Sequence, residues 1–106
     1  MNVELGFDFH PGAAEDFLDI WESIAEENAL AARHLREEIL NAITELIPFP
    51  LQGHKRLDLT SRPLRFRVVR EYLIAYCPDR KPLLVLAILH GRRNPKVIAA
   101  ILEQRQ

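Results

Sequence analysis

The spacing of apolar residues predicts a strand followed by two helices in the first half of the chain. Residues 3–9 alternate apolar and polar positions, which is the period of a strand with one buried face. Pro11 interrupts this pattern, and from Ala13 the apolar residues recur at helical spacing. Asn28 is a suitable N-cap for a second helix, and Pro48 ends that helix.

Each of the two predicted helices carries one apolar stripe. The stripe of the first helix consists of Phe17, Ile20, Trp21 and Ile24. The stripe of the second helix consists of Leu35, Ile39, Ala42, Ile43 and Leu46. Because only a few residues separate the helices, we expect them to pack as an antiparallel hairpin.

The second half of the chain has the spacing of β-strands. Residues 64–69 alternate large apolar and basic or small side chains, and residues 72–77 form a second strand pattern. Residues 83–89 are seven consecutive apolar residues, which indicates a strand buried on both faces and ended by Gly91. Short connections between the three strands predict an antiparallel meander.

A loop and a last helix complete the predicted architecture. Residues 48–63 contain three prolines and predict a loop, with a short strand near Leu57 and Leu59. Asn94 is a plausible N-cap, and Pro95 at the first helical position begins a short amphipathic C-terminal helix. The fold class is therefore α+β: an N-terminal strand, a helical hairpin packed on an antiparallel β-sheet, and a short C-terminal helix.

Length and composition predict one globular domain over residues 1–106. The chain is 48% hydrophobic and 27% charged, as in ordinary globular proteins. No apolar stretch approaches the roughly 20 residues that span a bilayer, and the acidic N-terminus does not resemble a signal peptide. Cys77 is the single cysteine, so no intrachain disulfide is expected, and we predict a buried thiol in a cytoplasmic protein.

Charge is distributed very unevenly between the two halves. Residues 1–47 contain eleven acidic residues and two arginines, whereas residues 48–106 contain four acidic and twelve basic residues. The corresponding net charges are −9 and +8. Two interpretations remain open: the halves present surfaces to different partners, or acidic helices and a basic sheet attract each other within one fold.

Four arginines are the main candidates for binding an anionic partner. Arg65 and Arg67 lie two residues apart on a predicted strand, so both should project from one face of the sheet. Together with Arg92 and Arg93, they predict a patch for nucleic acid or for an acidic protein. The alternative is that Arg65 and Arg67 pair with acidic residues of the helical hairpin or are simply solvated.

Other candidate residues are fewer. His90 could act as an acid or base, although a structural hydrogen bond at a strand end explains it equally well. Trp21 fits the core because it lies on an apolar stripe, and the alternative is that it flanks a partner groove. Tyr72 and Tyr76 share a strand face, which sheet packing explains better than base stacking. The histidines lack metal-ligand spacing, so neither a metal site nor a cofactor is predicted.

Several short segments, taken in order, resemble the ParE/RelE superfamily of bacterial toxins and are most similar to its ParE-like branch of plasmid stabilisation proteins. In the helical region the matching segments are Pro11, Ala14, Asp16-Phe17, Ile20-Trp21, residues 24–28 and Ala31-Ala32. In the loop and strands they are Phe49-Pro50, Gly53, Arg56, residues 67–69, residues 72–76 and residues 89–93. Together these segments span nearly the whole chain, and their order and spacing match the family.

The resemblance implies a function and partners. ParE-like proteins are the toxins of type II toxin–antitoxin modules, described as inhibitors of DNA gyrase that a cognate antitoxin silences by wrapping the toxin. The resemblance therefore implies a cytoplasmic protein that forms a hetero-oligomer with its antitoxin, needs no cofactor, and acts by binding rather than as an enzyme. The residues expected to contact the antitoxin or the target are Arg65, Arg67, His90, Arg92, Arg93 and Trp21.

Two alternatives stay open. RelE-like members cut mRNA in the ribosome, and a nuclease of this kind would use His90, Arg65, Arg67 and Arg92. RNA cleavage needs a proton acceptor and a proton donor, and such members typically carry an aromatic residue or histidine near the C-terminus. The predicted C-terminal helix contains no Tyr, His or Phe, which favours the binding mechanism. The last alternative is a decayed, non-toxic module that still binds an antitoxin.

Overall fold

The elements follow the predicted order within residues 6–106, which are the residues that the computed structural model describes. They are β1 (Phe7–Phe9), α1 (Pro11–Ala25), α2 (Ala29–Leu46), the 3-10 helix η2 (Pro50–Gln52), β2 (Arg65–Val69), β3 (Tyr72–Cys77), β4 (Leu83–His90) and α3 (Pro95–Gln104). Of the strand predicted over residues 3–9, residues 7–9 form β1, and residues 3–5 lie outside the described residues. The α+β class is confirmed.

Asparagine side chains begin two of the helices. The Asn28 side chain accepts a hydrogen bond from the Ala31 N–H at 3.0 Å, which satisfies a backbone donor at the start of α2. The Asn94 side chain accepts from the Lys96 N–H at 2.9 Å at the start of α3. Both N-caps predicted from the sequence are confirmed.

The sheet has the order β1-β4-β3-β2. The strands β2, β3 and β4 form the predicted antiparallel meander, and β1 pairs in parallel with the start of β4. Because β1 is only three residues long, it covers β4 only from Leu83 to Val85. The second half of β4 therefore presents a sheet edge, which lies beside α1.

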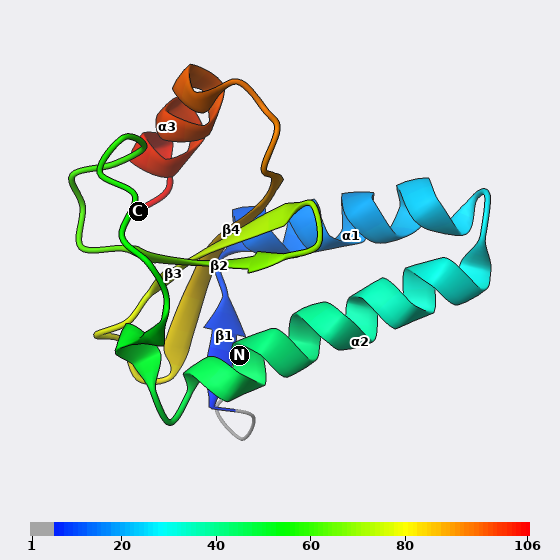
Figure 1. The fold of residues 1–106 in the computed structure, drawn as a ribbon, viewed down its shortest axis with the longest axis horizontal. Coiled ribbons are helices and arrows are strands. Elements are labelled where there is room, and N and C mark those ends of the chain that lie inside the picture. The colour runs from blue at the N-terminus through cyan, green and yellow to red at the C-terminus, as the bar shows by residue number, and fades with distance from the viewer. Residues whose placement is uncertain (1–5) are drawn as a thin grey trace.

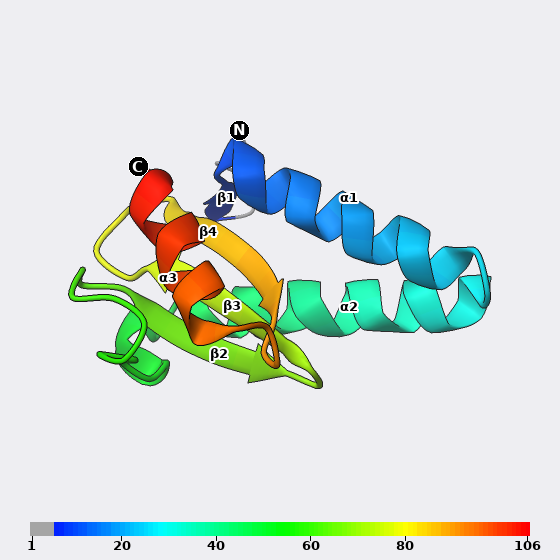
Figure 2. The same ribbon diagram turned by 90° about the horizontal axis from the view of Figure 1, so that it is seen from above.

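The helices form layers on opposite faces of the sheet (Figure 1, Figure 2). The hairpin of α1 and α2 packs on one face, and both views show that the turn joining these helices lies far beyond the sheet. The short helix α3 covers the other face. The predicted hairpin on a sheet is confirmed. In its distal half, α1 and α2 can pack only against each other.

The strand β4 contributes to the packing on both faces, as its unbroken apolar run predicts. On the hairpin face, Val85 and Ile88 pack with Ile39 and Ile43 of α2. The opposite face forms a second core, whose buried members are Leu59, Leu64, Phe66, Leu73, Ala75, Cys77, Leu86, Ala87, Leu89, Ile98 and Leu102. The Cys77 thiol is buried there, as predicted, and burial raises its pKa.

The predicted short strand near Leu57 and Leu59 is wrong. The backbone N–H groups of Leu59 and Thr60 both donate to the Arg56 carbonyl at 2.9 and 3.1 Å, which closes a turn instead. The edge of β2 is paired earlier in this loop, where His54 forms an isolated bridge with Phe66. The alternation of apolar residues at 57 and 59 thus reflects a turn that buries only one of them.

None of the helices in the described part of the chain combines the length and the apolar character needed to cross a membrane.

Candidate functional site

A groove runs between the two long helices and the first strand, and we call it the hairpin groove. It has a volume of about 550 Å³. Its walls are Phe7 and Phe9 of β1, Ala14, Phe17, Leu18 and Trp21 of α1, and Arg36 and Leu40 of α2. Apolar side chains that remain open to solvent in a concave site are typical of a binding surface for another molecule.

Trp21 lies in the wall of the hairpin groove rather than in the centre of the core. Its neighbours on the stripe, Ile20 and Ile24, pack against the core of the hairpin face, whereas Trp21 is half-buried and lines the groove. The sequence favoured a core position for Trp21. The geometry agrees with the alternative, in which the indole flanks a groove.

Arg36 gives the hairpin groove a positive charge. It is one of only two basic residues among residues 1–47, and it makes no ion pair with any described residue. A lone guanidinium at an apolar wall favours a carboxylate on whatever fills the groove. Reasoning from the sequence did not identify Arg36, although its rarity in an acidic region was a usable signal.

Arg65 and Arg67 are engaged in contacts within the molecule. Arg67 forms an ion pair with Glu45 of α2 at 2.9 Å. Arg65 donates hydrogen bonds from Nη1 to the carbonyl oxygens of Leu51 at 3.3 Å and Gly53 at 3.0 Å. Both side chains lie on the hairpin face, and for Arg67 the contact is the expected alternative of a basic strand attracted to an acidic helix.

Arg92 and Arg93 follow the end of β4 and are exposed. Within residues 6–106, neither forms an ion pair. Arg92 borders a shallow hollow of about 310 Å³, which it shares with Val68 and Leu73 of the α3 face. These two arginines are therefore available to an anionic partner.

The structure does not assemble the four arginines into one patch. Arg65 pairs across the sheet with Tyr76, while His90 at the end of β4 pairs with Tyr72, four residues further along β3. At about 3.3 Å per residue, roughly 13 Å separates these two rows, and roughly 7 Å separates the row of Arg67, which pairs with Ile74, from the row of His90. Arg67 contacts Glu45 of α2 and Arg65 contacts the Gly53 carbonyl, whereas Arg92 borders the hollow shared with Val68 and Leu73, so the structure places these arginines in two groups.

His90 is held by three neighbours. Its Nδ1 accepts a hydrogen bond from the Arg92 N–H at 3.1 Å, and its Nε2 lies 3.4 Å from a carboxylate oxygen of Glu71. The ring of Tyr72 packs edge-on against the imidazole, with centroids 5.6 Å apart. These contacts are the structural hydrogen bonding that the sequence left open as one explanation of His90.

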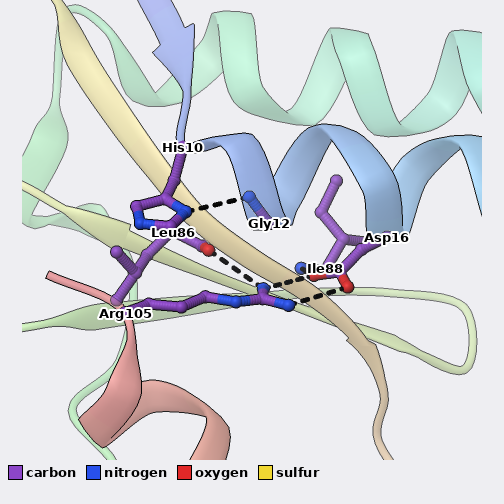
Figure 3. A network of polar contacts seen from close by, with 6 residues as sticks. All are labelled: His10, Gly12, Asp16, Leu86, Ile88 and Arg105. Carbon is purple, nitrogen blue, oxygen red and sulfur yellow. Dashed lines mark hydrogen bonds and ion pairs between the residues drawn. The ribbon is translucent and has the colours of Figure 1, made fainter.

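A polar network joins the C-terminal end of the chain to α1 and to the free edge of β4 (Figure 3). The Arg105 guanidinium donates to both oxygens of Asp16, at 2.6 and 3.1 Å, and to the Leu86 carbonyl at 3.2 Å. The same carboxylate accepts from the Ile88 N–H at 3.0 Å. Asp16 thus satisfies a backbone donor on the part of β4 that β1 leaves uncovered.

A second arginine, Arg62, also forms hydrogen bonds with the C-terminal end of the chain. Arg62 donates to the carbonyl oxygens of Leu102 and Arg105, both at 2.6 Å. Carbonyls in the last turn of a helix have no partner within the helix, so Arg62 completes the end of α3. We call Asp16, Arg62 and Arg105 together the C-terminal clasp. The sequence did not predict the contacts that these three residues make.

His10 borders the C-terminal clasp and begins α1. Its Nδ1 accepts a hydrogen bond from the Gly12 N–H at 2.9 Å, which requires that nitrogen to be unprotonated. Burial, followed by the positive charge of Arg105, lowers the pKa of His10 below its ordinary value of 6.5, against an opposing effect of Asp16. The neutral imidazole is therefore the form that the fold selects.

The architecture agrees with a match to a known protein family. The model of the family described as "ParE toxin of type II toxin-antitoxin system, parDE" matches residues 7–95. The chain belongs to the ParE toxin family. The resemblance noted in the sequence is confirmed, and an antitoxin is the partner that membership of a type II module implies. No curated protein matches the chain significantly.

The family match covers some features of this ParE toxin and not others. It extends from β1 to Pro95, the first residue of α3, and so includes every residue of the hairpin groove. Arg105 and most of α3 lie beyond it. In the part of the chain that the structure describes, no group of three or more His, Cys, Asp or Glu residues could hold a metal ion.

Proposed function

We propose that this ParE-family toxin inhibits DNA gyrase by binding it, and that its cognate antitoxin silences it by docking an apolar, acidic segment in the hairpin groove. The observation that carries the proposed antitoxin site is a preformed apolar groove whose lining includes Arg36, a cation that forms no ion pair with a described residue. Gyrase as the target is supported by the family membership.

The composition of the groove suits a peptide. Phe9, Phe17 and Trp21 offer aromatic surface, and Leu18 is exposed at the rim. An amphipathic segment buries its apolar side chains in such a groove and gains affinity from the apolar area removed from water. A carboxylate opposite Arg36 would then fix the register of the segment.

A binding mechanism also fits the chemistry of the other candidate residues. Cleavage of RNA needs one group that accepts a proton and another that donates one. The nitrogens of His90 already contact Arg92 and Glu71, and residues 95–106 contain no Tyr, His or Phe. These observations favour inhibition by binding over the RelE-like endonuclease. Binding to gyrase would take place in the cytoplasm, with the antitoxin complex as a hetero-oligomer.

The proposed function is tested first by controlled induction of the toxin with and without its cognate antitoxin. We expect loss of colonies with the toxin alone and rescue by the antitoxin. Purified toxin should then inhibit DNA supercoiling by the host's own gyrase. Cuts in mRNA at the ribosomal A site, with supercoiling intact, would favour the endonuclease. Normal growth with folded toxin present would favour a decayed module.

The antitoxin site is tested with matched pairs of variants. Arg36→Glu should weaken antitoxin binding by roughly tenfold or more, about 1.4 kcal/mol, whereas Arg33→Glu should not. Both residues are exposed on α2, but only Arg36 lines the groove. Leu18→Ser should weaken binding and Leu30→Ser should not, for the same reason. Equal affinities within each pair, measured by calorimetry, would place the antitoxin elsewhere.

A further inference from the structure

Two large apolar side chains project into solvent from the chain that follows α2. Phe49 is 67% exposed and Leu51 is 65% exposed. They flank Pro50 at the start of η2, and we call this pair the 49–51 projection. Single exposed apolar residues are common on protein surfaces, but two on one short turn form an apolar patch of the kind that binds other molecules.

Side-chain hydrogen bonds fix the backbone of this turn. The hydroxyl of Tyr76, a fully buried side chain, donates to the Pro50 carbonyl at 2.7 Å and accepts from the Gly53 N–H at 2.9 Å. Arg65 adds its hydrogen bonds to the carbonyls of Leu51 and Gly53. A Cβ on Gly53 would overlap the Tyr76 hydroxyl, so the glycine permits this close approach.

A rigid turn that exposes apolar side chains is suited to binding. The buried Tyr76 hydroxyl and the Arg65 guanidinium hold the backbone in place, while Phe49 and Leu51 themselves add little to the core. Because the backbone is already ordered, the toxin loses little conformational entropy when a partner covers these side chains. Aromatic residues, phenylalanine included, are enriched in the buried centres of protein interfaces.

The surroundings of the projection indicate what kind of surface would cover it. Pro50 also lines a hollow of about 500 Å³, together with Ile47, Pro82 and the basic residues Arg80 and Lys81. Asp79 is the acidic residue next to these two cations in the chain, and neither cation forms an ion pair with a described residue. A partner that covers both features needs apolar side chains flanked by carboxylates.

We propose that the toxin binds the protein that it inhibits through the 49–51 projection, with Arg80 and Lys81 at its rim. The expected partner surface has an apolar hollow for Phe49 and Leu51 and acidic side chains beside it. This inference rests on the proposed toxin function. It places the target on a surface that shares no lining residue with the hairpin groove, so target and antitoxin contacts are separable by mutation.

The test compares two double variants of the full-length toxin. Phe49→Ser/Leu51→Ser removes the projection, and Leu30→Ser/Leu57→Ser removes two similarly exposed apolar residues outside it. All four positions are exposed, so both proteins should fold, which circular dichroism checks. Growth inhibition after induction and affinity for the purified antitoxin are measured for each protein. The growth measurement does not depend on gyrase being the target.

We expect Phe49→Ser/Leu51→Ser to need at least about tenfold more toxin for the same growth inhibition, with antitoxin affinity within about twofold of wild type. The Leu30→Ser/Leu57→Ser control should match wild type in both measurements. Undiminished toxicity of the projection variant would overturn the inference. Loss of antitoxin binding by that variant would overturn it as well, since the projection would then belong to the antitoxin interface.

The charged rim provides an independent arm. Arg80→Glu/Lys81→Glu should reduce growth inhibition by roughly tenfold, whereas Lys55→Glu/Lys96→Glu, which also reverses two exposed cations, should not. Equal effects of the two charge reversals would mean that net charge alone matters and would overturn the acidic partner surface. A wild-type toxin without effect on growth would refute the proposed function itself, and this inference with it.

Discussion

The two helical layers that cover the sheet differ in how much of their attachment is apolar. The hairpin of α1 and α2 docks through a continuous apolar stripe, in which Ile39, Ile43 and Leu46 of α2 are fully buried. The helix α3 is shorter, and its fully buried residues are Ile98 and Leu102. Its attachment is completed by the arginines of the C-terminal clasp.

The difference shows how a small layer is held on a sheet. Two buried aliphatic side chains supply only a few kcal/mol, about 1.5 to 3 kcal/mol each, before the entropy of ordering the helix is subtracted. Arg105 and Arg62 add charge-assisted hydrogen bonds at the end of α3, where backbone carbonyls would otherwise lack partners. The α3 layer should therefore be sensitive to polar substitutions that the hairpin would tolerate.

The largest effect is expected from breaking the C-terminal clasp. Asp16→Ala leaves the Arg105 guanidinium, only 17% exposed in its side chain, without its carboxylate, and leaves the Ile88 N–H without an acceptor. We expect the free energy of unfolding in urea to fall by about 3 kcal/mol. Asp58→Ala, which breaks the exposed ion pair with Arg56, should cost far less. Equal losses would show that the clasp is no stronger than a surface pair.

Removing the Tyr76 hydroxyl tests a polar contact on the hairpin side of the sheet. Tyr76→Phe leaves the buried Gly53 N–H without its acceptor, so stability should fall by about 1 to 2 kcal/mol. Tyr72→Phe is the matched control, because the Tyr72 hydroxyl makes no hydrogen bond to the described residues. A comparable loss in the two variants, measured by thermal unfolding, would contradict the role assigned to the Tyr76 hydroxyl.

The two asparagine caps compare the layers through the same chemistry. Asn28→Ala at α2 should lower the free energy of unfolding of the whole protein by about 1 kcal/mol. Asn94→Ala at α3 should instead speed amide hydrogen exchange within residues 95–104 while the amides of α2 keep their protection. Uniformly faster exchange in the Asn94 variant would mean that α3 unfolds only together with the hairpin.

The smallest effect is a dependence of stability on pH. Because the pKa of His10 is lowered in the folded state, its contribution is fully present above the ordinary value of 6.5. It is lost as the pH falls from 6.5 through the folded pKa, since the unfolded chain binds the proton first. The difference between wild type and His10→Asn, which keeps an N-cap acceptor without titrating, isolates this contribution. A difference that stays constant from pH 7.5 to 5 would contradict it.

Much of the fold was predictable because its signals are local. The stripe of Ile39, Ile43 and Leu46 defined the buried face of α2, and the capping asparagines defined two helix starts. The unbroken run of residues 83–89 correctly indicated a strand between two layers. The error near Leu57 arose because two apolar residues in alternation also fit a turn, and only backbone hydrogen bonding distinguishes the two.

The candidate site was predictable only in part. The sequence identified Trp21 and left open whether it lies in the core or at a groove, which depends on how α1 and α2 pack against β1. It did not identify Arg36, whose importance comes from lining that groove. Nor could it separate Arg65 and Arg67, which are engaged within the molecule, from Arg92 and Arg93, which form no ion pair with described residues.

The sequence by itself determined the long helices, the main strands and their order, the two-sided burial of β4 and the family, because each depends on neighbouring residues or on an ordered series of short segments. Only the tertiary structure decided which charged groups are already engaged. Asp16 and Arg105 are 89 positions apart in the chain, and Arg67 and Glu45 are 22 apart. Such pairs form because the fold brings them together in space, and no local pattern encodes that distance.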